Sequence, residues 1–263
     1  FITNIASEMP AHVMAQGYLD GMVIMGYNPF RPQYQAIWFA LLDRGYRVPG
    51  VAEMDAGLSD AGLWRKESAM LTYVPNTSDK LTTAKLVELF RKGRMFASTG
   101  PMIEIEVDGQ PMGGVVTTGA NISHIVRITV MPAGGKRVGR VEIIGRGGEI
   151  LWAQNEVDGP TVELTLPGSD VRGYFIARVF GAGSSPADWR GVRDFAITNP
   201  VYLHPRGTAF EKPMTTSVTV TIRPDSPFAG GEIHFESTDG ELLGKAAAVG
   251  TTRETLPADG RLT

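Results

Sequence analysis

The chain has 263 residues, 43% of them hydrophobic and 20% charged, which is the composition of a globular protein with room for two domains. The formal net charge of −3 gives no basic field for nucleic acid, and no apolar run approaches the ~20 residues of a membrane span. The absence of cysteine excludes disulfides, zinc–thiolate sites, iron–sulfur clusters and a cysteine nucleophile. It leaves the compartment open, with a periplasmic or secreted location slightly favoured over a cytoplasmic one.

Helical periodicity is confined to the first 93 residues. The apolar patterns there predict a strand over 22–25, a helix from Gln33 to Gly45, a strand over 48–52 and a helix from Thr82 to Lys92. Alternating strands and helices are typical of an α/β fold. We therefore expect residues 1–94 to form a partial α/β portion of a protein that is α+β overall.

After Gly93 the hydrophobic period changes from 3.6 to 2. The alternation over 103–107, followed by the turn pair Asp108-Gly109, predicts a hairpin. Six more strands are predicted over 122–130, 141–144, 149–152, 161–166, 174–180 and 199–203. Short strands at this spacing, joined by turns rich in the 32 glycines and 17 prolines, favour an antiparallel β-sandwich over 95–205.

A further β-region follows a linker at 206–214. Residues 217–222 alternate, and another strand is expected over 231–236, followed by the turn pair Asp239-Gly240. We therefore expect 215–263 to be the start of a second small β-module. Because expected elements break off at both ends, we also expect the sequence to be part of a longer, multidomain protein.

The four histidines form no metal-binding motif, since His12, His124, His204 and His234 lie far apart in the sequence. His124 has the same parity as the apolar residues around it, which predicts a packed or hydrogen-bonded histidine. His204 and His234 lie at the edges of β-regions, where exposure to solvent is expected. Only His12 belongs to the α/β portion.

Three acidic residues follow the strand predicted over 48–52: Glu53, Asp55 and Asp60. Loops at the carboxyl ends of strands line the ligand crevice of α/β folds. Carboxylates in such a place can bind a divalent cation or orient a water molecule. An equally weighted alternative is a solvated loop that carries a helix N-cap.

Two other motifs do not predict a catalytic site. Gly183-Ser184-Ser185 lacks the Gly-x-Ser-x-Gly elbow, so a nucleophilic triad is not favoured. The glycine-rich stretch 145–148 joins two predicted strands with no helix after it, which predicts a hairpin turn and not a phosphate loop.

Several short motifs in order resemble the PHP superfamily (polymerase and histidinol phosphatase), and in particular its carbaryl-hydrolase-type, CehA/McbA, branch. Residues 81–101 are similar to a helix of that branch that ends in Gly-Arg and leads to a Thr-Gly-Pro turn, after which 103–109 opens a β-domain. Residues 37–49 resemble its tryptophan helix, 51–56 take the place of its metal segment, and 195–203 resemble the close of its β-domain.

The resemblance implies a distorted β/α barrel with a site of two or three metal ions that hydrolyses a small-molecule ester or phosphoester. Asp55 is the one family ligand that can be placed, and Glu53, Asp60 and His12 are possible supporting residues around it. The implied cofactor is a divalent metal (Zn, Mn or Fe). Because the family's His-x-His strand and middle histidines are absent here, either most ligands lie outside this chain or the protein is a non-catalytic relative.

The alternative hypothesis is a non-catalytic, extracellular β-rich module that binds carbohydrate or protein. Trp152, Trp189 and Tyr174 would be its contacts, and Trp189, in a predicted loop, is the best candidate for the surface. Trp152 is more simply explained as core packing.

Overall fold

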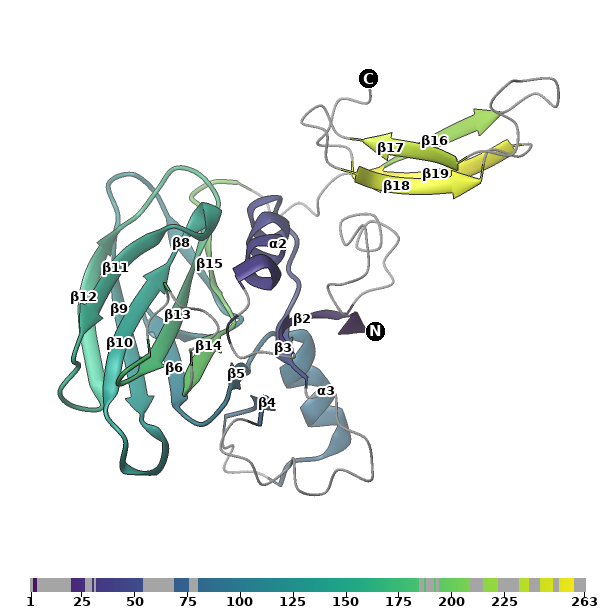
Figure 1. Cartoon of the computed structure of the whole chain (residues 1–263). Helices are drawn as coiled ribbons and strands as arrows, with labels where there is room; N and C mark the ends of the chain where they lie inside the picture. Colours follow the sequence, from purple (N-terminus) through teal and green to yellow (C-terminus); the bar gives the residue numbers. More distant parts are fainter. Residues whose placement is uncertain are drawn as a thin grey trace, which may run out of the picture.

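The computed structural model describes residues 2–3, 20–26, 30, 32–53, 69–75, 80–184, 187, 192, 194–208, 215–221, 232–236, 242–247 and 251–257. This part of the chain is mostly β and contains two α-helices (Figure 1). The β-rich character predicted from the turn and strand patterns is therefore confirmed.

The N-terminal sheet is parallel. Strands β1 (Ile2–Thr3), β2 (Gly21–Met25) and β3 (Gly50–Ala52) lie in the order β1-β2-β3, and helix α2 (Pro32–Asp43) connects β2 to β3. As predicted, the chain leaves the helix at Gly45, whose φ of 87° suits a residue without a Cβ atom. The predicted strand–helix–strand unit is therefore confirmed.

A second unit of the same kind does not follow. Strands β4 (Leu71–Tyr73) and β5 (Phe96–Ser98) flank helix α3 (Thr83–Arg91), but they pair antiparallel with each other in a different, larger sheet. In helix α3 Leu89 is buried and Leu86 is 38% exposed, and Phe90 packs in a small cluster with Val23 of β2 and Val51 of β3. The predicted order of strand, helix, strand and helix is present, but the described residues do not show a β/α barrel.

Two sheets form the central β-region. The large sheet has the order β11-β10-β13-β14-β5-β4, with β15 paired to β13 and β8 paired to β15, and the small sheet has the order β12-β9-β6-β7. The strands are β6 (Met102–Val107), β7 (Gln110–Pro111), β8 (Val115–Thr118), β9 (Ser123–Met131), β10 (Val138–Ile144), β11 (Ile150–Asn155), β12 (Thr161–Pro167), β13 (Gly173–Gly181), β14 (Phe195–Thr198) and β15 (Val201–Pro205).

All the strands predicted between 103 and 203 are present, and β8 and β14 are additional. The two sheets pack face to face around an apolar core that includes Ile105, Ile128, Val141 and Val179. This is a two-layer arrangement of the sandwich type.

The large sheet is covered on both faces. Helix α2 and strand β2 pack against its other side, in a second core that contains Trp38, Phe39, Tyr174 and Phe195 (Figure 1). Because of this double cover, β13 is buried along nearly its whole length, whereas β9 alternates strictly between buried and exposed residues. The α/β portion and the sandwich therefore share a core, and no break in packing coincides with the division at 94.

The C-terminal strands pair in two antiparallel ladders, one between the first and last strands of this region and one between the two strands that lie between them in the sequence. Strand β16 (Thr215–Thr221) pairs antiparallel with β19 (Thr251–Pro257), and β17 (Glu232–Glu236) pairs antiparallel with β18 (Leu242–Ala247). The strands predicted over 217–222 and 231–236 are thus present.

Candidate metal segment at the end of strand β3

Glu53 lies at the carboxyl edge of the parallel sheet. It directly follows β3, and its N–H donates to the carbonyl of Met25, at the end of β2, over 2.9 Å. A Cβ atom on Gly26 would lie 3.3 Å from Glu53 Oε1, so the Glu53 side chain passes close to the end of β2. This is the edge at which parallel α/β sheets present groups to ligands.

The other residues predicted for the site are not among the described residues. Asp55, Asp60 and His12, and also Trp189 of the alternative binding surface, lie outside them. Their roles remain predictions. Asp55 follows Glu53 by two positions, so the described end of β3 leads directly into the predicted metal segment.

Side chains from the large-sheet region close the outer edge of β3. Asn199 Oδ1 accepts from Gly50 N at 2.7 Å, and Asn199 Nδ2 donates to the carbonyls of Gly50 and Met95, each at 2.9 Å. Thr72 Oγ1 accepts from Ala52 N at 2.9 Å and donates to Ala52 O at 3.1 Å. These two side chains satisfy the backbone groups that a further strand would pair with, so the sheet ends at β3.

Helix α2 fixes the start of the same strand. Trp38 Nε1 donates to Val48 O at 2.8 Å, and the Trp38 side chain is completely buried. A Cβ atom on Gly50 would lie 2.6 Å from Ile24 Cδ1 and 2.9 Å from Trp38 Cζ2, so a larger residue would force one or both side chains to shift. Strand β3, and with it Glu53, is therefore held from both sides.

The sequence pattern does not single out Asn199 or Thr72. It places Asn199 in the last predicted strand, yet this residue precedes β15 and is completely buried. The dipeptide Asn199-Pro200 is the available signal, because a proline cannot continue a paired strand and marks a break in the ladder. Nothing in the sequence indicates that the amide reaches a strand 149 positions earlier.

The sequence-based predictions also do not include a buried ion pair within the large sheet, which a hydrogen bond links to α2. Arg178 on β13 donates through Nε and Nη2 to Glu142 Oε2 on β10, at 3.0 and 2.7 Å, and through Nη1 to Gln35 Oε1 on α2 at 2.8 Å. Burial lowers the pKa of Arg178 below its ordinary value, and the Glu142 carboxylate opposes that shift. Glu142 also accepts from Arg140, whereas the buried Nε2 of Gln35 has no hydrogen-bond partner among the described residues.

The histidine prediction in the sandwich is confirmed. His124 is completely buried, with Nδ1 2.7 Å from Asp108 Oδ2 and Nε2 2.9 Å from Thr118 Oγ1. His204 is partly buried, with Nε2 2.8 Å from the carbonyl of Thr208. Both rings are held by protein groups, and neither lies in a cluster of metal-binding side chains among the described residues.

The glycine-rich stretch 145–148 is a turn between β10 and β11, as predicted. Of the aromatic residues considered for a binding surface, Tyr174 is buried and stacks with Phe39, and Trp152 is partly buried against the sandwich core. These two residues therefore serve packing.

The described residues contain no group of three or more His, Cys, Asp or Glu side chains that could hold a metal ion. Glu53 is a single carboxylate, and one carboxylate does not make a metal centre. The described residues alone therefore do not fit the metal that the PHP resemblance implies.

No protein-family model matches the chain, and no curated protein is significantly similar to it. No described helix has both the length and the apolar character needed to cross a membrane.

Proposed function

We propose that the chain is the C-terminal portion of a PHP-like, metal-dependent hydrolase of the CehA/McbA type that acts on an ester or phosphoester. The observation that carries the proposal is the β2–α2–β3 unit, which ends in Glu53 at the carboxyl edge of a parallel sheet. The short motifs between residues 37 and 203, which occur in the same order along the chain as in that family, support the same assignment.

In this proposal β3 is the last strand of a partial β/α barrel. The edge of β3 is closed by Asn199 and Thr72, so the sheet has no place for another strand on that side. Further barrel strands would join on the β1 side, and they would carry most of the metal ligands. Asp55 would supply one ligand, with Glu53 and Asp60 near it.

A divalent metal in such a site lowers the pKa of a bound water and polarises the substrate. The residues of this chain would contribute by holding the Asp55 segment in place. Asn199 and Thr72 bind the backbone of β3, and Trp38 binds Val48 just before it, so the segment that follows β3 starts from a fixed point. No catalytic step is assigned to the described residues.

The test is metal analysis of the full-length protein encoded by the gene, together with hydrolysis of p-nitrophenyl acetate and bis(p-nitrophenyl) phosphate. We expect at least ~0.5 equivalents of a transition metal after purification. The Asp55→Asn variant is expected to lose metal and hydrolysis. Asp158→Asn, which changes an acid with 93% side-chain exposure in the sandwich, is the matched control and is expected to keep both.

A full-length protein with less metal than this, whatever its fold, would contradict the proposal. The gene offers an independent check, because the region upstream of Phe1 should encode a strand that carries His-x-His. If both results are negative, the non-catalytic, extracellular β-rich binding module is the remaining hypothesis, with Trp189 as its predicted contact.

A further inference from the structure

A cavity of about 330 Å³ lies between helix α2 and the turn that joins β10 to β11. The helix lines it with residues three or four positions apart, a spacing that puts them on one face: Pro32, Gln35, Ala36, Phe39, Ala40 and Asp43. Phe30, Gly147, Gly148 and Arg178 also line it. Glu53 is not among the described lining residues, so ligand binding here is independent of the proposed hydrolase function.

Gln35 brings a buried hydrogen-bond donor to the wall of this cavity. Its Oε1 accepts from Arg178 Nη1 at 2.8 Å, and because a guanidinium group only donates, this contact identifies the oxygen end of the amide. The other end is Nε2, which is buried and has no hydrogen-bond partner among the described residues. Gln35 as a whole is 1% exposed. Since nearly all buried polar groups in folded proteins are paired, this donor indicates an acceptor that a bound molecule supplies.

Gln35 cannot satisfy Nε2 by turning its amide over. Arg178 is held in place by Glu142, whose Oε2 accepts from Nε and Nη2 at 3.0 and 2.7 Å. A reversed amide would place Gln35 Nε2 against Arg178 Nη1, donor against donor. The unpaired donor is therefore a fixed feature of this part of the molecule.

The rest of the lining is mainly apolar and is firmly held. Phe39 stacks on Tyr174, with the ring centroids 6.2 Å apart. Asp43 accepts from Gly147 N at 3.0 and 3.1 Å, which ties the turn to the end of the helix. A Cβ atom on Gly148 would lie 2.6 Å from Phe39 Cδ2, so the turn and the helix approach closely there. A preformed cavity with apolar walls and few polar groups is typical of a small-molecule site.

The charges around the cavity favour a neutral ligand. Arg178 pairs with Glu142, so its charge is balanced within the protein. Asp43 lies two helical turns from Gln35, about 12 Å along the axis, and its carboxylate disfavours an anion. A cation would meet only donors at Gln35 Nε2 and Arg178.

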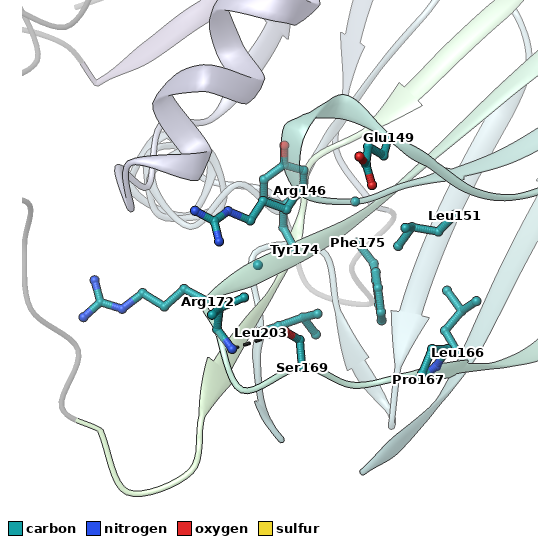
Figure 2. A pocket seen from close by; sticks show the side chains of 13 residues that line it. Arg146, Glu149, Leu151, Leu166, Pro167, Ser169, Arg172, Tyr174, Phe175 and Leu203 are labelled. Atoms are coloured by element: carbon teal, nitrogen blue, oxygen red, sulfur yellow. Dashed lines mark hydrogen bonds between the residues drawn. The ribbon is translucent and has the colours of Figure 1, made fainter. Parts of the chain in front are cut away.

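A second cavity borders the same turn through Gly145 and Arg146. Figure 2 shows it, with Leu151, Leu166 and Phe175 on one side. The two cavities share no lining residue among those described. A purely apolar ligand would suit the second cavity, whereas a ligand with an acceptor atom suits the cavity beside α2.

We propose that the cavity beside α2 binds a small neutral aromatic molecule with a carbonyl oxygen, which accepts from Gln35 Nε2 while the ring packs against Phe30 and Phe39. The small side chains of Ala36 and Ala40 leave room for a flat ring beside the helix. The volume of about 330 Å³ is near the lower end of the ~300–1,000 Å³ of ligand pockets, which suits one or two rings.

The experiment is an NMR titration of the protein, ¹⁵N-labelled on its glutamine side chains, with benzamide and with benzamidine. These probes have nearly the same shape, but benzamidine carries a cationic donor in place of the carbonyl oxygen. For benzamide we expect a saturable shift of the Gln35 side-chain signal, with a Kd of about 1–10 mM, as befits a ligand of this size. Benzamidine is expected to bind at least ~5-fold more weakly, because it has no acceptor for Nε2.

One substitution separates the donor from the rest of the site. Gln35→Glu keeps an acceptor for Arg178 and removes the Nε2 donor. Measured on the ligand signals by saturation transfer, it is expected to weaken benzamide binding about tenfold and to make benzamidine the tighter ligand. The matched control is Gln33→Glu, the same change at an exposed position of α2 outside the described lining, which should leave both affinities unchanged.

Two further variants distinguish the two cavities. Ala36→Phe fills the cavity beside α2 from an exposed helical position and is expected to abolish benzamide binding. Val171→Phe enlarges a 50% exposed side chain in the second cavity and is expected to leave binding unchanged. Circular dichroism spectra confirm that each variant keeps its fold.

Three results would overturn the proposal. Without saturable benzamide binding to the folded protein, water would be the partner of Gln35 Nε2. Equal affinity for the two probes, or an unchanged preference in a folded Gln35→Glu variant, would show that the amide does not contact the ligand. Loss of binding in Val171→Phe but not in Ala36→Phe would place the ligand in the second cavity.

Discussion

Single polar side chains hold this molecule together at the points where its sheets end. Asn199 is the clearest case, since one completely buried amide satisfies backbone groups of Gly50 and Met95. Within the large sheet, Arg178 on β13 pairs with Glu142 on β10 and donates to Gln35 on α2. Removing one member of such a group leaves buried partners unsatisfied, which costs more than the net value of the bond itself.

For Asn199→Ala we therefore expect a loss of about 3 kcal/mol in the free energy of unfolding, measured by urea denaturation. Asn199→Asp keeps the acceptor for Gly50 N but places a carboxylate oxygen against the carbonyl oxygens of Gly50 and Met95. It should be at least as destabilising at neutral pH. The loss should become smaller as the pH falls, because a protonated carboxyl group can again donate one hydrogen bond. A pH-independent loss would contradict this assignment of the amide.

Glycines at positive φ provide a second residue-scale prediction. A Cβ atom on Gly113 (φ 75°) would lie 1.7 Å from the carbonyl oxygen of Lys92, at the end of α3, whereas on Gly109 (φ 76°) it would meet nothing within 4 Å. Gly109→Ala should therefore cost only the left-handed backbone penalty of about 1–2 kcal/mol. Gly113→Ala should cost clearly more, about 3 kcal/mol or above, because backbone must move. Equal losses in the two variants, measured by urea denaturation, would show that the contact with α3 is not tight.

At the scale of elements, helix α3 depends on its own surface because it buries little. Thr82 caps its start by accepting from Lys85 N at 3.2 Å, and Glu88 pairs with both Lys85 and Lys92, at 3.0 and 2.6 Å. Hydrogen bonds from Lys92 and Lys85 lower the pKa of Glu88 from its usual 4.5 to about 2. These local interactions are the kind that helical spacing predicts from sequence.

This lowered pKa gives the contribution of Glu88 a definite pH dependence. A carboxylate with a depressed folded-state pKa stabilises above its unfolded pKa near 4.5, and the effect is lost as the pH falls toward 2. The thermal midpoint of Glu88→Gln should thus lie slightly below that of the unmodified protein at pH 7 and converge with it near pH 2–3. High salt should also reduce the difference, since the pairs are exposed. A difference that persists at low pH would exclude the ion pairs as its cause.

At the scale of the whole molecule, the α/β portion and the sandwich share a core across the large sheet. Met22 and Trp38 pack in the same buried cluster as Ile176 and Ile197. Strands β4 and β5 continue the large sheet on either side of α3. Because of this shared core, we expect the described residues between 20 and 208 to behave as one cooperative unit.

The two parts should therefore unfold together. Trp38 reports on α2 and Trp152 on the sandwich, so variants that keep one of these tryptophans and replace the other three with Phe separate the two signals. We expect the fluorescence midpoints in urea to coincide with each other and with the far-ultraviolet circular dichroism midpoint. An earlier transition for Trp38 would show that the α/β portion is a separate folding unit.

The sequence by itself determined the local elements. Periods of 3.6 and 2, turn pairs such as Asp108-Gly109 and the cap at Thr82 depend on neighbours within a few positions, and the strands and helices formed where these patterns predicted. The sequence also indicated that His124 is buried, because the alternation of a strand places it on the same face as the apolar residues around it. The placement of Glu53 after a buried strand came from the same reasoning.

Only the tertiary structure decided how those elements combine. The pattern around α3 did not reveal that β4 and β5 join the large sheet, because strand partners are chosen by contacts between distant segments. Asn199 reaches Gly50 across 149 positions, and the cavity beside α2 lies between this helix and the distant β10–β11 turn. Strand pairing, the burial of a sheet on both faces and the formation of cavities all depend on contacts between segments that are distant in the sequence. The periodicity of a single sequence does not encode these contacts.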